Sequence, residues 1–346
     1  MNEEREESVF IISMMEEPLV SILVPVYGVE RYIERCARSL FEQTYENLEF
    51  VFVNDCTPDK SMEVLAKVME DYPERKGQVT ILSHDTNRGL AAVRNTLLDH
   101  CHGEFLIHVD SDDWVESHIV ELLMKKQQEN DADIVSGLML FHFTDRVEKE
   151  ANSGTGLDKD TYLQEFLRSH LRWFAANRLF RTTLYREHAI RWEEGINLNE
   201  DFLVMPRLLY YARQIGVVEE YTYHYERRNE NSYMEKFARS WDLQQQVIKS
   251  HQFIDTFFQD KEPVLRETTH RLTIKQYRDM LWMTLENNNR KGYDYTMRHI
   301  QTMPHEYWSE IGWDNGLKRW LESHYHLARL TLPLRRWHGR RVRSDE

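Results

Sequence analysis

Four consecutive residues, Asp110-Ser111-Asp112-Asp113, follow an apolar run and form the part of this sequence best suited to chemistry. Three of the four are carboxylates, which repel one another unless a cation lies among them. Hard divalent cations such as Mg²⁺ and Mn²⁺ prefer such oxygen ligands and often share them with the phosphates of a substrate. A solvated turn, with Asp113 capping a helix that begins near Trp114, would explain the same residues without a metal. The cluster predicts one of these two structures.

Polar residues also end other apolar runs. The runs are VSILVPV (20–26), LEFVFVN (48–54) and EFLIHVD (104–110). Tyr27 follows the first run, Asp55 follows the second, and Arg94 lies in a helical pattern that precedes the third. In an open parallel sheet, ligands bind beyond the carboxyl ends of the strands. We therefore expect aromatic, acidic and basic side chains to converge on one rim with the acidic cluster.

The elements that must position these residues alternate between strand and helix over the first 140 residues. Near-continuous apolar runs are typical of strands buried on both faces, and the stretches between them carry apolar residues at helical spacing. The predicted strands are 20–26, 48–54, 79–83, 104–110 and 133–140, and the predicted helices are 29–41, 62–72, 87–100 and 116–130. This alternation predicts an α/β fold, with a mostly parallel sheet covered by helices on both faces.

The rest of the chain changes character twice. Residues 142–160 are polar and predict a surface loop. Residues 161–235 mix helical patterns with an aromatic strand candidate at 219–226. From about residue 240 onwards the apolar residues have helical spacing only, which predicts a helical C-terminal region.

The composition is that of an ordinary globular protein. Of the 346 residues, 41% are hydrophobic and 29% are charged, and no uninterrupted apolar stretch could span a membrane. The acidic N-terminus is unlike a signal peptide, and three cysteines are too few for a disulfide framework or a zinc cage. A net charge of −14 argues against coating the phosphates of a nucleic acid. We therefore expect a cytoplasmic protein that does not bind nucleic acid.

The motifs of the first half point to a nucleotide-sugar site. Neither a Gly-x-Gly-x-x-Gly motif nor a P-loop occurs there, which argues against a dinucleotide dehydrogenase or a P-loop enzyme. Instead, VSILVPVYGVERYIERCARSLFEQTYENLEFVFVNDCTPDKS, NRGLAAVRN and HVDSDDW, in this order, resemble the donor-binding half of family-2 glycosyltransferases. The resemblance covers about residues 19–140, weakens through 171–235 and does not extend beyond about 240. It implies a glycosyltransferase-A fold, in which a Rossmann-like nucleotide-binding sheet is followed here by the helical region.

The resemblance assigns roles to residues that match the family's motifs. Pro25, Val26 and Tyr27 match the segment that lines the nucleoside pocket, with Tyr27 beside the base. Asp55 matches the carboxylate that recognises the base edge, and Arg94 matches the basic residue near the diphosphate. Each has a structural alternative: Tyr27 could pack at a strand end, Asp55 could organise a turn, and Arg94 could form an ion pair on a helix surface.

The acidic cluster matches the family's D-x-D motif, which implies Mn²⁺ or Mg²⁺ as cofactor. Asp112 corresponds to the direct metal ligand, and Asp110 lies toward the ribose or the waters of the metal. Ser111 between them is assigned to donor binding. The sequence departs from the family at Gly28, where Asn is frequent, and at Asn54, where Asp is frequent.

In the second half, Leu198-Asn199-Glu200-Asp201-Phe202 resembles the family's E-D motif, whose Asp is the catalytic base. A base is needed because a sugar hydroxyl is a poor nucleophile, and its deprotonation contributes about 10²–10⁴-fold. The resemblance implies Asp201 as the base, although an acidic pair that opens a helix also complements the helix dipole. Residues 177–180 resemble the family's N-K-L-[YF] element. The segment 223–228 resembles an aromatic and basic segment that closes the active site, and either Arg227 or Arg228 could supply its cation.

The resemblance implies an inverting glycosyltransferase. It would transfer a hexosyl or N-acetylhexosaminyl group from a nucleotide-sugar, most simply a UDP-sugar, to a glycan or lipid-linked acceptor, as in bacterial surface polysaccharide biosynthesis. A sugar-phosphate nucleotidyltransferase is one alternative, but the Gly-rich basic loop expected after its first strand is missing. A non-catalytic glycosyltransferase-like binding protein is another, and the presence of Asp110, Asp112 and Asp201 together counts against it.

Three domains are predicted. Residues 1–18 are an acidic extension, residues 19–235 are the catalytic domain with a donor half (19–140) and an acceptor half (141–235), and residues 236–346 are the helical region. Residues 317–346 carry eight Lys and Arg against three acidic residues, with leucines and a tryptophan interleaved. This basic tail either lies on an anionic membrane surface, which would place the protein at the inner membrane face, or ends a packed helix in solvent. No feature of the sequence indicates an oligomeric state.

Overall fold

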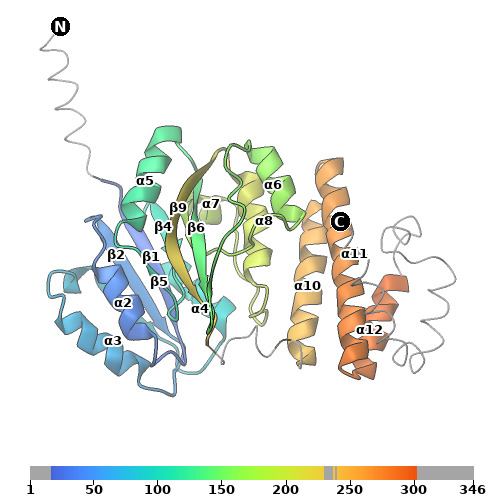
Figure 1. Ribbon diagram of the computed structural model, residues 1–346, viewed down its shortest axis with the longest axis horizontal. Coiled ribbons are helices and arrows are strands. Elements are labelled where there is room, and N and C mark those ends of the chain that lie inside the picture. Colours follow the sequence, from blue (N-terminus) through green and yellow to red (C-terminus); the bar gives the residue numbers. More distant parts are fainter. Residues whose placement is uncertain (1–16, 230–236, 238–239, 302–346) are drawn as a thin grey trace, which may run out of the picture. The chain divides into compact units, whose positions relative to one another are not determined.

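The computed structural model describes residues 17–229, 237 and 240–301 (Figure 1). They group into two compact units. The first unit comprises residues 17–165, 171–195 and 204–229, and the second comprises residues 166–170, 196–203, 237 and 240–301. Most of the predicted acidic extension (1–18) and all of the basic tail (317–346) lie outside the described residues.

The first unit contains a mixed sheet. Its strands are β1 (Val20–Val26), β2 (Leu48–Asn54), β3 (Val79–Ser83), β4 (Phe105–His108), β5 (Trp114–Val115), β6 (Ile134–His142), β7 (Val147–Lys149), β8 (Arg178–Arg181) and β9 (Ile215–Glu226). Within the described residues the order is β3-β2-β1-β4-β8-β6-β9-β5, with β7 paired to β6. The neighbouring strands among β1 to β4 pair in parallel. Since β8 is antiparallel to both β4 and β6, β6 runs in the same direction as β1 to β4. β9 pairs in parallel with β6 and therefore also runs in that direction. The prediction of a mostly parallel sheet is confirmed, and the longer strands end at the same edge.

Helices follow the parallel strands as the alternation predicts. They are α2 (Ile33–Phe41), α3 (Ser61–Glu70), α4 (Leu90–His100), α5 (Ile119–Asn130), α6 (Lys159–Leu167), α7 (Thr182–Glu187) and α8 (Asp201–Tyr211), with a short 3-10 turn at Lys76–Gln78. α2 and α3 pack against each other, and α4 packs on β1 and β2. All seven residues of β1 are buried, which requires cover on both faces of the sheet.

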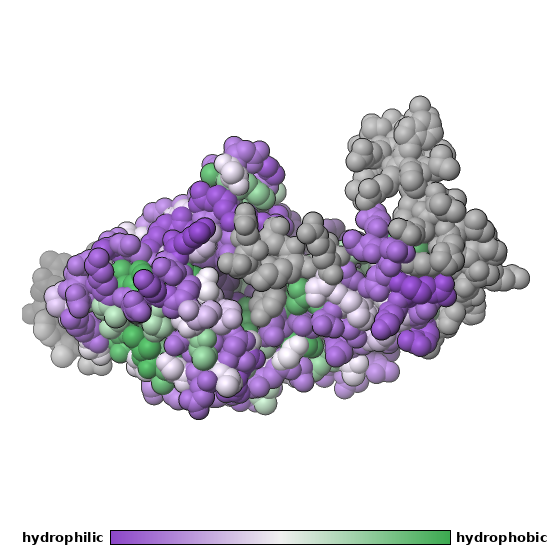
Figure 2. Space-filling view, turned by 90° about the horizontal axis from the view of Figure 1, so that it is seen from below, coloured by the Kyte–Doolittle hydropathy of each residue, from purple (hydrophilic) through white to green (hydrophobic). Residues whose placement is uncertain are grey.

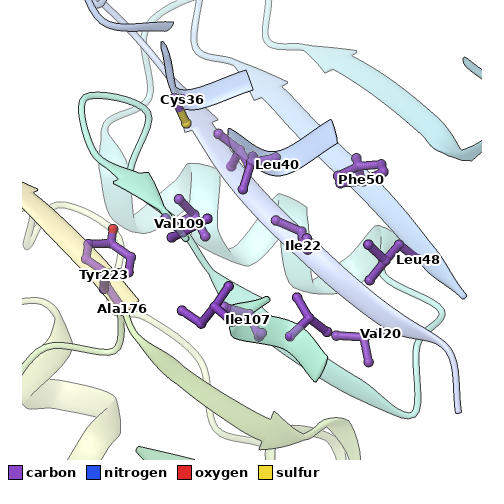
Figure 3. Close-up of a cluster of buried hydrophobic side chains, with 14 of the residues drawn as sticks. Val20, Ile22, Cys36, Leu40, Leu48, Phe50, Ile107, Val109, Ala176 and Tyr223 are labelled. Carbon is purple, nitrogen blue, oxygen red and sulfur yellow. The ribbon is translucent and has the colours of Figure 1, made fainter. Parts of the chain in front are cut away.

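The core of the first unit forms where neighbouring parallel strands place apolar side chains in register. Ile22 of β1 is paired with Phe50 of β2 on one side and with Ile107 of β4 on the other. Cys36 and Leu40 of α2 are fully buried in the same cluster (Figure 3). Burying side chains of this size contributes about 1.5–3 kcal/mol each, so this packing fixes the strand ends on which the polar residues lie.

Most predicted elements occur with small shifts, and the differences arise where pairing partners are distant. The strands predicted at 20–26, 48–54 and 79–83 have the observed bounds. The helix predicted to begin near Trp114 is wrong: Trp114–Val115 pairs with β9, and α5 begins only at Ile119. The polar stretch 142–160 contains the short strand β7. Both strands exist because β6 and β9 supply partners that no local pattern reveals.

The second unit is helical, as predicted for the residues described after 240. Its helices are α10 (Trp241–Phe258), α11 (Pro263–Glu286) and α12 (Arg290–Gln301). Ser240 caps α10 by accepting a hydrogen bond from the backbone N–H of Leu243, and Pro263 opens α11, where its missing N–H is not needed. Leu198, from the segment before α8, joins the apolar cluster that these helices form.

The face drawn in Figure 2 is mainly hydrophilic, and hydrophobic residues gather there only in small patches. Among the residues that the structure describes, no helix is both long enough and apolar enough to cross a membrane.

Two of the buried histidines should each contribute a loss of stability in mild acid, because the folded protein lowers their pKa values. Burial lowers the pKa of His251 from 6.5 to about 3, and burial followed by the charge of Arg94 lowers the pKa of His108. Between pH 3 and pH 6.5 the unfolded chain holds a proton on His251 that the folded protein does not hold. The contribution of His251 to stability therefore rises with pH and is lost as the pH falls. From pH 7.5 to pH 5, His251 alone should lower the free energy of unfolding by about 2 kcal/mol. Urea denaturation at both pH values measures this loss, which should shrink by that amount in His251→Leu; an unchanged loss would contradict it.

Candidate active site

A buried arginine holds Asp110 at the carboxyl end of β4. Nη2 of Arg94, on α4, lies 3.0 Å from Oδ1 of Asp110. The side chain of Arg94 is 1% exposed and that of Asp110 is 26% exposed. Among the described residues, Oδ2 of Asp110 has no hydrogen-bond partner. Arg94 is therefore not an ion-pair residue on a helix surface, and its charge lies beneath the rim of the sheet, where it favours an anionic ligand.

Asp112 lies close to Asp110 in the sequence, and its side chain is partly buried. Its Oδ2 accepts a hydrogen bond of 2.8 Å from Nδ2 of Asn229. Burial, and after it the charge of Asp110, raises the pKa of Asp112 to about 6. A cation between Asp110 and Asp112 would stabilise both carboxylates in the charged form.

Asp113 has a different role from its two acidic neighbours. It is fully buried. Its Oδ2 accepts a hydrogen bond from the Tyr223 hydroxyl at 2.7 Å, and its Oδ1 accepts one from the backbone N–H of Glu226 at 2.7 Å. Burial, and after it the charges of Asp112 and Asp110, raises the pKa of Asp113. Asp113 therefore connects the acidic loop, residues 110–113, to β9. The alternative in which Asp113 caps a helix is wrong.

Tyr223→Phe should destabilise the protein by about 1–3 kcal/mol, because it leaves Asp113 buried with one hydrogen-bond partner fewer. The same hydroxyl accepts a hydrogen bond of 3.1 Å from the backbone N–H of Asp110, so the acidic loop should also loosen. Urea denaturation measures the change. Tyr72→Phe is the control, since its hydroxyl bonds to Glu42 at the surface and its loss should cost less than about 0.5 kcal/mol. Equal effects of the two substitutions would contradict the role of Tyr223.

The buried side chain of Glu226 lies at the centre of a group of ion pairs beside the acidic loop. It is paired with Arg35 at 3.1 Å and with Arg228. Burial alone would raise the pKa of Glu226, but hydrogen bonds from Arg228 and Arg35 outweigh it and lower that pKa to about 2. Arg35 also donates to the backbone carbonyl of Asp112 at 3.1 Å, so this ion-pair group supports the acidic loop from below.

The same group separates the two arginines that the sequence leaves equivalent. Arg228 is committed to Glu226. Arg227 lies over the rings of Phe143 and Tyr225, at 5.8 and 5.9 Å from their centres, and forms no ion pair among the described residues. Of the two, Arg227 is the cation left available at the strand ends.

Asp55 shapes the loop that leads into α4. Its Oδ1 accepts from the backbone N–H of Arg88 at 2.8 Å and contacts Nδ1 of His84 at 2.7 Å, and its Oδ2 accepts from the N–H of Gly89 at 2.8 Å. Gly89 has a φ of +86°, which a side chain would strain, and α4 with Arg94 begins directly after it. A carboxylate has about four acceptor positions, and three are used here. The contact of Asp55 with a base edge stays a prediction.

The other residues assigned to the donor differ in how much side chain they present. Pro25 and Val26 are buried within β1, and Ser111 is 5% exposed. Tyr27 is 49% exposed, so packing at the strand end does not account for its ring. Of the segment predicted to line a nucleoside pocket, Tyr27 is therefore the ring that a base could stack on.

The acidic loop fits a divalent cation only in part. Asp110 and Asp112 supply carboxylate oxygens of the kind that Mg²⁺ and Mn²⁺ prefer, and their mutual repulsion would be relieved by such an ion. Across the described residues, however, no group of three or more His, Cys, Asp and Glu side chains is arranged to hold a metal. An ion here would need further oxygens, which the phosphates of a donor could provide.

Asp201 lies in the second unit, as the first residue of α8. The backbone N–H of Leu203 donates to the carbonyl of Glu200 at 3.0 Å, which closes the first turn of the helix. This position suits both a base and a residue that complements the helix dipole, so the role of Asp201 stays a prediction. The element at 177–180 is also placed: Asn177 has a φ of +62° and leads into β8.

Local sequence does not predict that Arg35, Tyr223, Glu226 and Asn229 contact the acidic loop, although the segment 223–228 was expected near the site. The last three lie in or just after β9, about 110 residues beyond the cluster that they contact. The aromatic strand candidate at 219–226 was a usable signal, because a strand with polar side chains on a buried face needs polar partners.

The sequence of this chain is similar to those of known glycosyltransferases. The sequence model described as glycosyl transferase family 2 matches residues 21–189. A relative from Bacillus subtilis, the uncharacterized glycosyltransferase EpsJ, is 32% identical over 224 residues, which are 63% of this chain and 63% of that protein. The poly(ribitol-phosphate) beta-N-acetylglucosaminyltransferase TarS of Staphylococcus aureus is 25% identical over 223 residues, 62% of this chain and 36% of TarS. The chain thus spans less than two thirds of the length of these relatives.

Solved structures show the same fold. The crystal structure of S. aureus TarS residues 1–349 with UDP-GlcNAc has a TM-score of 0.64 at 18% identity, covering 84% of this chain and 83% of that one. A mannosyltransferase from Pyrobaculum calidifontis, in complex with GDP-Man and Mn²⁺, has a TM-score of 0.56 at 14% identity, covering 92% and 85%. Residues 21–189 therefore form a glycosyl transferase family 2 domain. The chain has the α/β fold of glycosyltransferase-A type, with a helical region after it.

Proposed function

We propose that this protein is an inverting glycosyltransferase that transfers a hexosyl or N-acetylhexosaminyl group from a UDP-sugar to a hydroxyl of a glycan or lipid-linked acceptor. One observation carries the proposal: Asp110 and Asp112 stand at a strand end, and the buried guanidinium of Arg94 lies 3.0 Å from Asp110. Two carboxylates above a buried cation suit a magnesium or manganese ion that is shared with a diphosphate.

The proposed donor site comprises Pro25, Val26 and Tyr27 for the nucleoside, Asp55 for the base edge, and Arg94, Asp110 and Ser111 for the sugar diphosphate. Two structural neighbours support a nucleotide-sugar and a metal, since one is bound to UDP-GlcNAc and another to GDP-Man and Mn²⁺. The name of TarS, poly(ribitol-phosphate) beta-N-acetylglucosaminyltransferase, supports a polymeric acceptor with hydroxyl groups. We place the donor half at 19–140 and the acceptor half at 141–235.

In the proposed reaction, the acceptor hydroxyl attacks the anomeric carbon from the face opposite the nucleotide. The new carbon–oxygen bond forms as the bond to the diphosphate breaks, and that electron pair leaves with the nucleoside diphosphate. Asp201 takes the proton of the attacking hydroxyl. A divalent cation bound at Asp110 and Asp112 would supply charge stabilisation for the departing diphosphate. A single displacement of this kind inverts the anomeric configuration.

Thermal stabilisation by a panel of UDP-, GDP- and TDP-sugars, with and without Mn²⁺, tests the donor. We expect a metal-dependent rise in melting temperature with UDP-sugars, and slow release of UDP when no acceptor is present. Release of pyrophosphate from a sugar-phosphate and a nucleoside triphosphate would favour the nucleotidyltransferase alternative. Binding without any turnover would favour a non-catalytic protein.

We also propose peripheral membrane contact through the basic tail, at the inner face of the membrane. This proposal depends on sequence alone, since residues 317–346 lie outside the described part of the chain. Attraction of about 1 kcal/mol per basic residue would suffice for reversible binding that weakens with salt. Deleting residues 332–346 should reduce co-sedimentation with anionic liposomes and leave donor hydrolysis unchanged. Full-length protein that ignores such liposomes at low salt would contradict the proposal.

A further inference from the structure

The segment before Asp201 is fastened to one face of α10 by side-chain hydrogen bonds. Oε1 of Gln246 accepts from the backbone N–H of Asn197 at 2.8 Å and from that of Leu198 at 3.1 Å. Oγ of Ser250 accepts from Nδ2 of Asn199 at 2.7 Å. Gln246 and Ser250 are four residues apart, so they lie on the same face of the helix. Three consecutive residues are thus attached to two neighbouring positions of α10.

Apolar contacts reinforce the same attachment. Leu198 is 6% exposed and belongs to the cluster that contains Val247 and Ile248 of α10. The ring of Phe202 lies 4.5 Å, centre to centre, from the ring of His251. Asp201 therefore lies between a tether at 197–199 and a ring contact at 202, and both are made to α10.

The backbone in this segment needs such support. Residues 197–199 lie in neither a helix nor a strand, so no regular backbone pairing positions them. Asn199 has a φ of +63°, a left-handed conformation that costs free energy in residues other than glycine, although Asn tolerates it better than most. A strained, irregular turn holds one conformation only when surrounding contacts determine it, and here the side chains of α10 provide those contacts.

We propose that Gln246 is a positioning residue for catalysis, and that α10 acts as the support that sets the place of the general base. This inference depends on the proposed role of Asp201 as that base. A base must lie within hydrogen-bond reach of the proton that it removes, and a displacement of about 1 Å can cost about 10²-fold in rate. Loss of the Gln246 acceptor frees two backbone N–H groups, and the turn that carries Asp201 shifts.

Two substitutions at this position separate the hydrogen bonds from the packing. Gln246→Met keeps the length of the side chain and removes the acceptor, so kcat should fall roughly 10-fold or more with the dissociation constant of the donor unchanged. Gln246→Glu keeps an acceptor oxygen, so kcat should stay within about 3-fold of the wild-type value. Gln245→Met is the matched control, since Gln245 is half-buried on the same helix and its side chain makes no hydrogen bond to another described residue.

A double-mutant cycle with Asp201→Asn tests whether Gln246 acts through the base. In the Asp201→Asn protein, Gln246→Met should cause no further loss of kcat, whereas a purely structural effect would reduce kcat by the same factor in both backgrounds. Additive losses of kcat in the double mutant would overturn the inference, and so would a kcat for Gln246→Met equal to that of Gln245→Met. Neither outcome affects the proposed function, which a loss of kcat in Asp201→Asn alone would still support. If Asp201→Asn itself keeps full turnover, the proposed base is wrong and the inference falls with it.

A second variant guards against failure of Gln246→Met to fold. Ser250→Ala removes the acceptor of the Asn199 side chain and leaves Gln246 in place, so it should lower kcat in the same direction by a smaller factor. Its donor affinity should match that of the wild-type protein, and its melting temperature should fall by only a few degrees, since one hydrogen bond is lost. Wild-type kcat in both Ser250→Ala and a folded Gln246→Met would overturn the support role of α10.

Discussion

Asp201→Asn should lower the rate of sugar transfer by about 10²-fold or more and leave donor affinity unchanged. Asparagine has nearly the shape of aspartate and can still begin α8, but it cannot take a proton from the acceptor hydroxyl. Because the base acts only when the hydroxyl attacks, its removal should appear in kcat and not in donor binding. Steady-state transfer kinetics and Mn²⁺-dependent donor titration of the same preparation measure the two quantities.

Asp260→Asn is the control for this substitution, because Asp260 is an exposed acid between α10 and α11 with an 80% exposed side chain. Asp260→Asn should keep the wild-type rate of sugar transfer. It removes the same charge from the same unit, but at an exposed position outside the proposed site. If Asp201→Asn weakened donor binding as strongly as it slowed transfer, Asp201 would belong to the donor site. In that case Glu200, its neighbour, would be the next residue to test as base.

Asp112→Asn should weaken Mn²⁺-dependent donor binding by about 10²-fold or more, since even residues that only support metal ligands typically cost 10–100-fold. The substitution removes a ligand charge and keeps an oxygen that can accept from Asn229, 2.8 Å away in the wild-type protein. Without ligands, the variant should be at least as stable as the wild-type protein, because it no longer places a second charge beside Asp110. Thermal unfolding with and without Mn²⁺ and UDP separates the two effects.

Asp71→Asn is the control for Asp112→Asn, since Asp71 pairs with Arg38 at the surface. It should leave both donor binding and its dependence on Mn²⁺ unchanged. Wild-type Mn²⁺ dependence in Asp112→Asn would show that the acidic loop is not the metal site. A variant that is unfolded without ligands would instead show that Asp112, like Asp113, is needed for the fold.

Several features of this protein follow from the sequence by itself. Each parallel strand is a short apolar run, and each helix has apolar residues at its own period, so local pattern is enough to give the bounds of β1, β2 and β3. The polar residues that end these strands then meet at one edge, because parallel strands share their direction. The acidic cluster, Arg94 and Tyr27 could be found in this way, since their position depends only on where a strand or helix begins or ends.

Tertiary structure decided how these residues differ from one another. Asp110, Asp112 and Asp113 are alike in sequence, yet Asp113 is buried against Tyr223 because β9 brings that hydroxyl to it from 110 positions away. Arg227 and Arg228 are adjacent and equivalent by type, and only the place of Glu226 commits one of them to an ion pair.

The support of the turn before Asp201 likewise comes from Gln246, on a helix about fifty residues further along the chain. Local pattern encodes which element a residue joins. The partner of a side chain depends on the register and packing of distant elements, which no short stretch of sequence contains.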